Sequence, residues 1–548
     1  MRRGKPMRLY MRRFVLLLMT VLLFSSAATG CRPPKPLTGE EPSAPLPAEV
    51  SKPGLTGADP APSSPSPTNN PGGQDVSEPT LSPQPQLSPE PAPVLSPGVE
   101  VQKTEGQTAI GPFFGILPEL AWSPDGRYLA IYGEAKGYGL WIWDRVEGKV
   151  RRLLQLVDRS GEGKTAVAFF GWRRDGGALI YAVDGVQPDG PHLGRPGVTV
   201  YATSLDGTVQ HIAWLPGGPE LIRGQHFNAD TGWLLLHRGT DLWRLNVETG
   251  ETRLLKNDLP SWDGFFSITP DPNGDMVVYP EPEPTRHGLI VLDVASGREV
   301  RVGTEKEFAF SPVWSPDGKK LAFLSAAPKG EGKDYDFQVG EDGPLPPATR
   351  LNIVDTNGKL LASWTAPYGE KVGAPVWSAD GKHLAFLSAK VTPGPDGLEE
   401  VRWQRLLLAS PGGSLVDLGA AQGEWLTVAG FTPDGAQVLV YRYVSSGGVT
   451  ILAYGPHPNQ VRVLATEAVD EPLVWWKGQL LTARLALTSS DALDTQVYLM
   501  SLDGRAVRLT GSPGWKSRFT PFGSLLAYLS ADNQAPPYPI TVLVRNLP

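Results

Sequence analysis

The chain has 548 residues, a net charge of −7 and one cysteine, Cys31, so no disulfide bond can form within it. The first 30 residues carry six basic side chains and no acidic one, which leaves a net charge of −13 for residues 31–548. A chain this acidic is a poor candidate for binding nucleic acid or an anionic lipid surface, so we expect no nucleic-acid partner.

Residues 1–30 have the layout of a secretory signal peptide. Basic side chains precede the apolar run Phe14–Phe24, which is short for a membrane span, and small residues follow it. The ending Ala28-Thr29-Gly30-Cys31 resembles the lipobox of bacterial lipoproteins, with Ala28 where that family usually has Leu. The resemblance implies that Cys31 is lipidated, which predicts an extracytoplasmic protein anchored to the cell membrane. A plain secreted protein is the alternative.

Residues 31–100 form a proline-rich segment that we expect to be disordered. Residues 32–100 contain 19 prolines, mixed with Ser, Gly, Ala, Glu and Gln, and show no apolar periodicity. Such a composition cannot bury enough apolar surface to offset its chain entropy. Beside a lipid site it suits a semi-rigid tether that lifts the folded part away from the membrane. Filler without function is the alternative.

A short motif recurs over residues 101–548. Trp314-Ser315-Pro316-Asp317-Gly318 is followed by an apolar run from Leu321, and similar wording begins at Trp122 and Trp377. Pro-Asp-Gly between apolar runs predicts the tight turn of a β-hairpin. A third apolar run, a second turn and a fourth run follow in most units. Four antiparallel strands per unit, repeated along the chain, predict an all-β fold with a single closed β-propeller.

The sequence contains nine such units, of which two depart from the motif, so it predicts either eight or nine blades. The ninth unit ends at Pro548 without a fourth strand. The segment Gly98–Lys103 alternates as a strand would, and we expect it to supply that strand and close the ring.

The repeated wording resembles the WD40-like repeats of TolB-type β-propellers over about residues 110–548. Such repeats also form the propeller of prolyl oligopeptidase-like enzymes, in which a separate α/β-hydrolase domain carries the chemistry. The sequence has no Gly-x-Ser-x-Gly nucleophile elbow. The resemblance therefore implies a binding or interaction module.

Candidate catalytic and metal-binding residues are few. Asp125, Asp317, Asp380 and Asp434 hold a fixed place in the repeated turn, which indicates a structural role. A calcium loop that began at Asp271 would need Gly at its sixth position and Glu at its twelfth, where the sequence has Met276 and Pro282. The seven histidines show no metal-ligand spacing. We predict no catalytic residue, metal or cofactor.

Long connections between second and third strands are the clearest candidates for a binding face, because in a propeller they all emerge on one side. They are expected at Asp184–Gly197, Ala326–Thr349, Lys390–Val401, Leu485–Thr495 and Asp532–Pro539. The ligand-binding candidates in or beside them are His192, Tyr335, Asp336, Phe337, Trp403 and Tyr538. The favoured function is a lipid-anchored propeller that binds a protein or a cell-envelope polymer. The alternative is a secreted hydrolase or lyase that uses these loops near the central channel.

Overall fold

The computed structural model describes residues 99–548, apart from 105, 136, 157–164, 188–191, 193, 218–221, 258, 260–267, 282–287, 305–306, 327–348, 368–369, 394–398, 423–424, 444–448, 487–493 and 532–538. Every regular element in this part of the chain is a β-strand, which confirms the all-β prediction. No helix in these residues has the length and apolar character that a membrane crossing needs.

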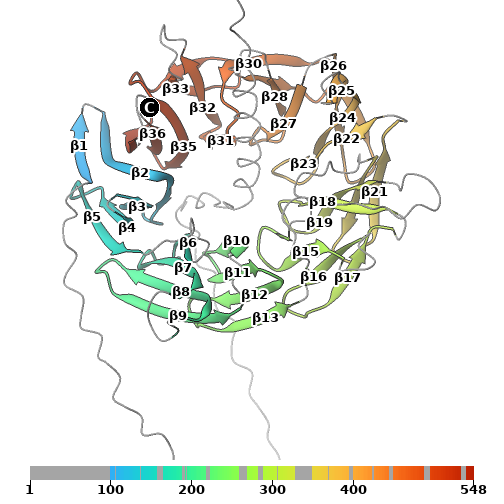
Figure 1. Ribbon diagram of the computed structural model, residues 1–548. Coiled ribbons are helices and arrows are strands. Elements are labelled where there is room, and N and C mark those ends of the chain that lie inside the picture. Colours follow the sequence, from blue (N-terminus) through green and yellow to red (C-terminus); the bar gives the residue numbers. More distant parts are fainter. Residues whose placement is uncertain are drawn as a thin grey trace, which may run out of the picture. The chain divides into compact units, whose positions relative to one another are not determined.

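The strands form four-stranded antiparallel units, which follow one another around a common centre (Figure 1). Five sheets hold one unit each, and the two eight-stranded sheets hold two units each, so the described residues build nine units. We call them blades 1 to 9 in chain order. Both departures from the motif are therefore full blades.

The first strand of each blade faces the centre and the fourth lies at the rim (Figure 1). Blade 1 has the second part of β2 (Gln107–Trp122), β3 (Tyr128–Glu134), β4 (Tyr138–Asp144) and β5 (Lys149–Gln155). Blade 2 has β6 (Thr165–Trp172), β7 (Ala178–Val186), β8 (Pro196–Ser204) and β9 (Val209–Pro216). Blade 3 has β10 (Ile222–Asn228), β11 (Trp233–Arg238), β12 (Asp241–Asn246) and β13 (Thr252–Lys256). Blade 4 has β14 (Thr269–Pro270), β15 (Met276–Pro280), β16 (Leu289–Asp293) and β17 (Glu299–Val302).

The second half of the chain continues the same order. Blade 5 has β18 (Phe308–Trp314), β19 (Lys320–Ala326), β20 (Arg350–Asp355) and β21 (Leu360–Thr365). Blade 6 has β22 (Lys371–Val372), β23 (Val376–Trp377), β24 (Leu384–Pro393), β25 (Glu399–Ala409) and β26 (Leu415–Gln422). Blade 7 has β27 (Trp425–Phe431), β28 (Val438–Tyr443), β29 (Val449–Tyr454) and β30 (Val461–Ala468). Blade 8 has β31 (Val474–Trp476), β32 (Gln479–Ala486), β33 (Asp494–Met500) and β34 (Ala506–Arg508).

Blade 9 is completed by the N-terminal part of the folded region. Its own strands are β35 (Trp515–Phe522), β36 (Leu525–Ala531) and β37 (Ile540–Asn546). The first part of β2 pairs with β37, from Gln107 opposite Arg545 to Phe113 opposite Ile540. The second part of β2 then pairs with β3 in blade 1, so one strand joins the last blade to the first.

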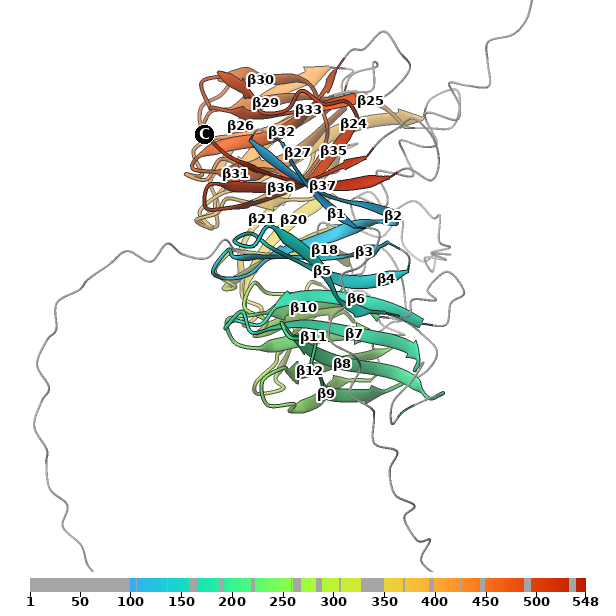
Figure 2. The ribbon, with the colours of Figure 1, turned by 90° about the vertical axis from the view of Figure 1, so that its left-hand side faces the viewer.

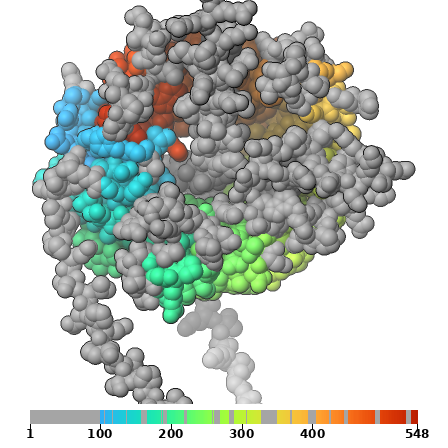
Figure 3. Space-filling model, in the orientation of Figure 1, coloured from blue at the N-terminus to red at the C-terminus, as the bar shows by residue number. Residues whose placement is uncertain are grey.

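The closing strand is not the one that the sequence predicted. Gly98 lies outside the described residues, and β1 (Glu100–Thr104) pairs only with β2, as a fifth strand at the rim of blade 9. The side view and the space-filling view show the N-terminal strands, in blue, beside the C-terminal strands, in red (Figures 2 and 3). The prediction that Gly98–Lys103 supplies the fourth strand of the last blade is therefore wrong. The next strand of the same hairpin, β2, supplies it.

The core lies between blades rather than within them. Nine clusters of buried apolar residues each unite two consecutive blades, and the cluster around Ile110, Trp141 and Val542 unites blade 9 with blade 1. Packing of this kind makes the burial of each blade depend on both neighbours, as expected of a repeat architecture.

The recurring tryptophan of the motif links neighbouring blades through its indole N–H. Each of four such groups donates a hydrogen bond to a backbone carbonyl in the preceding blade. The pairs are Trp122 Nε1 to Thr520 O at 3.0 Å, Trp172 Nε1 to Ala121 O at 2.9 Å, Trp314 Nε1 to Thr269 O at 2.9 Å and Trp377 Nε1 to Val313 O at 3.1 Å. The motif is thus explained by contacts between blades as well as by its turn.

The aspartate of the motif holds its own turn. Asp317 Oδ1 accepts hydrogen bonds from Ser315 Oγ at 2.6 Å and from Lys319 N at 3.1 Å, and Gly318 has φ 68°. The same bonds recur at Asp125, Asp380 and Asp434. The hydrogen bond from Ser378 lowers the pKa of Asp380 to about 2. These contacts give all four aspartates the structural role that the sequence indicated.

Candidate ligand-binding site on the inner strands

Alternation of strand direction gives each blade two unlike ends. Connections from second to third strands, and from each fourth strand to the next blade, leave at one end, which we call the loop face. The Asp-Gly turns lie at the opposite end, the turn face. Loop-face connections and the inner strands next to them are therefore the places where side chains of several blades can meet.

The inner strands of blades 9 and 1, β35 and β2, each contain a bulge in their pairing with the second strand of the blade. The pairing of β35 shifts register between Ser517 and Thr520, and Arg518 within that bulge has φ 57°. The pairing of β2 with β3 shifts between Phe114 and Glu119. Bulges redirect side chains out of the regular alternation and recur next to functional sites.

Arg518 on β35 is a positive charge that acts on two carboxyl groups, Glu119 of blade 1 and Glu471 in the connection from blade 7 to blade 8. Burial raises the pKa of Glu471 to about 8, against the opposing charge of Arg518, and the adjacent Asp470 raises it further. Burial also raises the pKa of Glu119 on β2, again opposed by Arg518. The pKa of Asp470 is raised by burial as well. We call Glu119, Asp470, Glu471 and Arg518 the inner carboxyl cluster.

Two tyrosines of β28 fix the segment that carries Asp470 and Glu471. Tyr441 donates its hydroxyl hydrogen bond to the backbone oxygen of Glu471 at 2.5 Å. Tyr443 donates to Asp470 Oδ2 at 3.3 Å. Burial raises the pKa of Tyr443 to about 12 and that of Tyr441 further still, so both hydroxyls stay protonated. The segment that carries these two carboxyl groups is thus fixed to blade 7, although it leads into blade 8.

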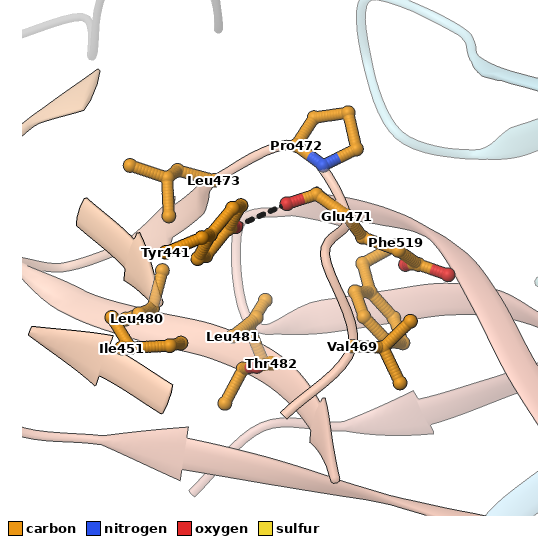
Figure 4. A pocket seen from close by; sticks show the side chains of 10 residues that line it. All are labelled: Tyr441, Ile451, Val469, Glu471, Pro472, Leu473, Leu480, Leu481, Thr482 and Phe519. Atoms are coloured by element: carbon orange, nitrogen blue, oxygen red, sulfur yellow. Dashed lines mark hydrogen bonds between the residues drawn. The ribbon is translucent and has the colours of Figure 1, made fainter. Parts of the chain in front are cut away.

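A small pocket lies beside this segment (Figure 4). Its walls are mostly apolar, from Ile451, Val469, Pro472, Leu473, Leu480, Leu481 and Phe519. The figure shows the carboxyl group of Glu471 turned away from Tyr441, on the side of Phe519. The apolar surroundings explain why Glu471 resists ionisation, because a charged carboxylate there loses solvation.

The inner carboxyl cluster can stabilise positive charge. Arg518 acts on both Glu119 and Glu471, and among the described residues no side chain or backbone group donates a hydrogen bond to either carboxyl group. Burial disfavours the bare carboxylates here, and an ammonium or guanidinium group of a ligand that paired with them would offset this cost. The residues within the described ranges form no set of three or more His, Cys, Asp or Glu side chains that could hold a metal ion.

Only part of the predicted binding face can be placed. Cys31, Tyr335, Asp336, Phe337 and Tyr538 lie outside the described residues, so those assignments stay predictions.

Trp403 lies on β25, where its backbone is paired with Lys390 and Gln422. The prediction of a loop over Lys390–Val401 is wrong for most of these residues. Strands β24 and β25 continue through them as a paired hairpin, up to Pro393 opposite Glu399.

His192 is the one predicted site residue whose side chain is described. It lies in the β7–β8 connection and stacks on Trp214 of β9, with ring centroids 4.1 Å apart and an interplanar angle of 8°. It is thus at the rim of blade 2 and makes no described contact with the inner carboxyl cluster. Asp184, expected to begin this loop, is instead a buried residue of β7 paired with Arg238 of blade 3 at 2.8 Å.

The inner carboxyl cluster was missed because Glu119, the pair Asp470-Glu471 and Arg518 lie far apart in the sequence and follow no local spacing. The signal present in the sequence was the pair Asp470-Glu471 in front of Pro472, just before the unit with the weakest motif. Its meaning depends on Arg518 and Glu119, which only the packing of blades 8, 9 and 1 brings near.

No protein-family model matches the chain. A 93-residue stretch is 31% identical to a putative Tricorn-like protease C-terminal subunit of Sulfurisphaera tokodaii, which is 17% of this chain and 11% of that protein. The Tricorn protease homolog of Saccharolobus solfataricus is 31% identical over 93 residues, 8% of its length. The chain therefore spans about a tenth of the length of these relatives.

Similar solved structures are β-propeller-like and distant in sequence. An oligogalacturonate lyase in complex with manganese is 14% identical, with a TM-score of 0.31 over 66% of this chain and 97% of that one. Porphyromonas gingivalis dipeptidyl peptidase 4 is 12% identical, with a TM-score of 0.41 over 78% of this chain and 58% of that one.

Proposed function

We propose that this chain is a lipid-anchored, extracytoplasmic propeller of the TolB type that binds a protein or a cell-envelope polymer through its loop face. The observation that carries the proposal is the inner carboxyl cluster, in which Arg518 opposes the raised pKa of both Glu119 and Glu471 and Asp470 lies next to Glu471. Its carboxyl groups are held by a rigid scaffold and lack enough protein cations. A ligand with amino or guanidinium groups would supply them.

The proposal is tested by comparing binding by the full chain and by paired variants. The probes are isolated cell-wall polymer in co-sedimentation and membrane proteins in cross-linking at the native surface. Glu119→Gln with Glu471→Gln should weaken capture at least ten-fold, because neither amide can form the carboxylate that would pair with a cationic ligand. Glu147→Gln is the matched control, since Glu147 is exposed in a turn on the turn face. Equal capture by all three proteins would contradict the proposal.

Anchoring is a separate part of the proposal and rests on the layout of residues 14–31. Cys31→Ser should move the protein from the membrane fraction to the soluble fraction and abolish incorporation of labelled palmitate. More than one acyl chain gives durable anchoring, at about 0.8 kcal/mol per buried methylene. A Cys31→Ser protein that stays in the membrane and still takes up palmitate would refute it. In an anchored protein, the proline-rich residues 31–100 would act as the spacer between lipid and propeller.

A second function is favoured by one specific feature of the same cluster. A carboxyl group with a pKa of about 8, as at Glu471, is protonated at neutral pH and is suited to general-acid catalysis. A secreted hydrolase or lyase acting on envelope polymer would use it in that role. Release of fragments from the polymer by the wild type, lost in Glu471→Gln with binding retained, would select the enzyme over the binding module.

A further inference from the structure

The rim of blade 2 carries a group of aromatic and imidazole rings that the inner carboxyl cluster does not use. The outermost strand β9 pairs with β8 so that His211 lies opposite Tyr201 and Trp214 lies opposite Thr199. His192 comes from the β7–β8 connection and lies over Trp214. His192 and His211, 19 positions apart in the sequence, are thus brought to one place at the edge of the sheet.

The indole of Trp214 has room because a glycine lies beneath it. A Cβ atom on Gly197 would come within 2.7 Å of Trp214 Nε1. The connection that presents His192 is fixed by backbone hydrogen bonds, including Arg195 N to His192 O at 2.9 Å and Gly194 N to Gln187 O at 3.0 Å. The position of the His192 ring is therefore set from both sides, by its connection and by the indole.

The two imidazoles lie near each other and are poor in partners. The ring centroids of His192 and His211 are 6.0 Å apart, with an interplanar angle of 36°. The His211 ring is also oriented edge-on against Tyr201, at 5.9 Å and 81°. The Nδ1 atom of His192 is buried and has no hydrogen-bond partner in the described structure. Neither imidazole makes a hydrogen bond to the described residues through its ring.

This spacing fits two histidines that share one metal ion. Zn–N bonds of about 2.0–2.1 Å place the metal about 3.2 Å from each ring centroid, so two ligating rings have centroids about 5 to 6.4 Å apart, depending on the angle at the metal. The observed 6.0 Å falls at the wide end of this range and corresponds to an angle of about 140° at the metal, between the tetrahedral angle and a trans pair of ligands. Imidazole nitrogen is a preferred ligand of Cu²⁺, Zn²⁺ and Ni²⁺, with Cu²⁺ bound most tightly.

We propose that His192 and His211 form a binding site for a divalent transition-metal ion at the rim of blade 2, with solvent completing the coordination. No third His, Cys, Asp or Glu joins them among the described residues, so the site keeps positions open to water or to a ligand atom from a partner. Trp214 and Tyr201 act as positioning residues that orient the two rings. The site is independent of the inner carboxyl cluster and of the function proposed for it.

The test is a titration of the full chain with Cu²⁺, followed by calorimetry and by electron paramagnetic resonance of the bound ion. The wild type should bind one Cu²⁺ with two nitrogen ligands. Even the loss of an outer-shell partner weakens metal binding about 10–100-fold, so His192→Gln and His211→Gln should each weaken it at least ten-fold. The control is His457→Gln, because His457 is an exposed histidine in blade 7.

A second readout separates metal binding from simple ring packing. Zn²⁺ should raise the melting temperature of the wild type and of His457→Gln, since a ligand that binds only the folded state stabilises it, and should leave both single variants unchanged. The proposal is overturned if either single variant binds Cu²⁺ as the wild type does, or if His457→Gln weakens binding as much as they do. Loss of stability in the variants with no metal response in the wild type would show that the rings only pack.

Discussion

The ion pair between blades 2 and 3 gives the sharpest test of how the blades are held together. Asp184 Oδ1 accepts from Arg238 Nε at 2.8 Å, and the two side chains are 1% and 3% exposed. Asp184 Oδ2 also accepts the backbone N–H of Ile222, in the inner strand of blade 3. The substitution Arg238→Met keeps the size of the side chain and leaves this carboxyl group without its cation.

The expected cost follows from burial. Removing one partner of a buried ion pair costs about 3–5 kcal/mol, because the remaining charge is left without compensation. Burial already raises the pKa of Asp184 even with Arg238 beside it, so in the variant the carboxyl group will take up a proton and limit the loss to about 3 kcal/mol. Adding Asp184→Asn should recover most of this loss, since the amide oxygen can still accept from Ile222.

Urea unfolding between pH 5 and pH 8 measures both the size and the sign. The folded pKa of Asp184 lies above its unfolded value, so stability falls as the pH rises from the unfolded pKa through the folded one, and this fall should extend to higher pH in Arg238→Met. The control is Arg127→Met, because the Arg127–Asp144 pair also spans 2.8 Å but the arginine side chain is 43% exposed. Such a surface pair should contribute about 0–1 kcal/mol. Equal losses in the two variants, independent of pH, would refute the argument.

Three further predictions follow from other contacts. The stability of Glu471→Gln relative to the wild type, measured by urea unfolding, should increase as the pH rises from 5 to 9. The folded pKa of about 8 makes ionisation of Glu471 destabilising in the wild type, and the variant has no such group; parallel curves of stability against pH would contradict this. Trp314→Phe should lower the free energy of unfolding by about 1 kcal/mol through loss of its hydrogen bond to blade 4, whereas Trp425→Phe, at a 47% exposed position, should not. Deleting residues 107–113 should cause aggregation in size-exclusion chromatography, and deleting 100–104 should not, since only the former pairs with β37.

The architecture could be predicted because the repeat is local. The turn, the third strand and the inter-blade tryptophan all fall within one unit, so each copy of the motif reports on its own blade. Closure could not be predicted to the strand, because residues 100–104 and 107–113 both have a strand pattern. Gly106, with φ 80°, folds them into one hairpin, and the choice of which strand meets β37 depends on burial of Ile110 and Phe113 between blades 9 and 1.

The candidate site escaped prediction for the opposite reason, since its residues depart from the repeat. Ser311 in β18 and Arg518 in β35 hold the same place, the first residue of a bulge in the inner strand, with φ 50° and 57°. The backbone is repeated while the side chain differs, so the scaffold tolerates a serine in blade 5 and presents a guanidinium in blade 9. Because only the bulge conformation is fixed by folding, the side chain at this position is free to serve a ligand. When the units are compared in sequence, inner-strand positions that are equivalent but differ in charge are therefore the best candidates for ligand contacts.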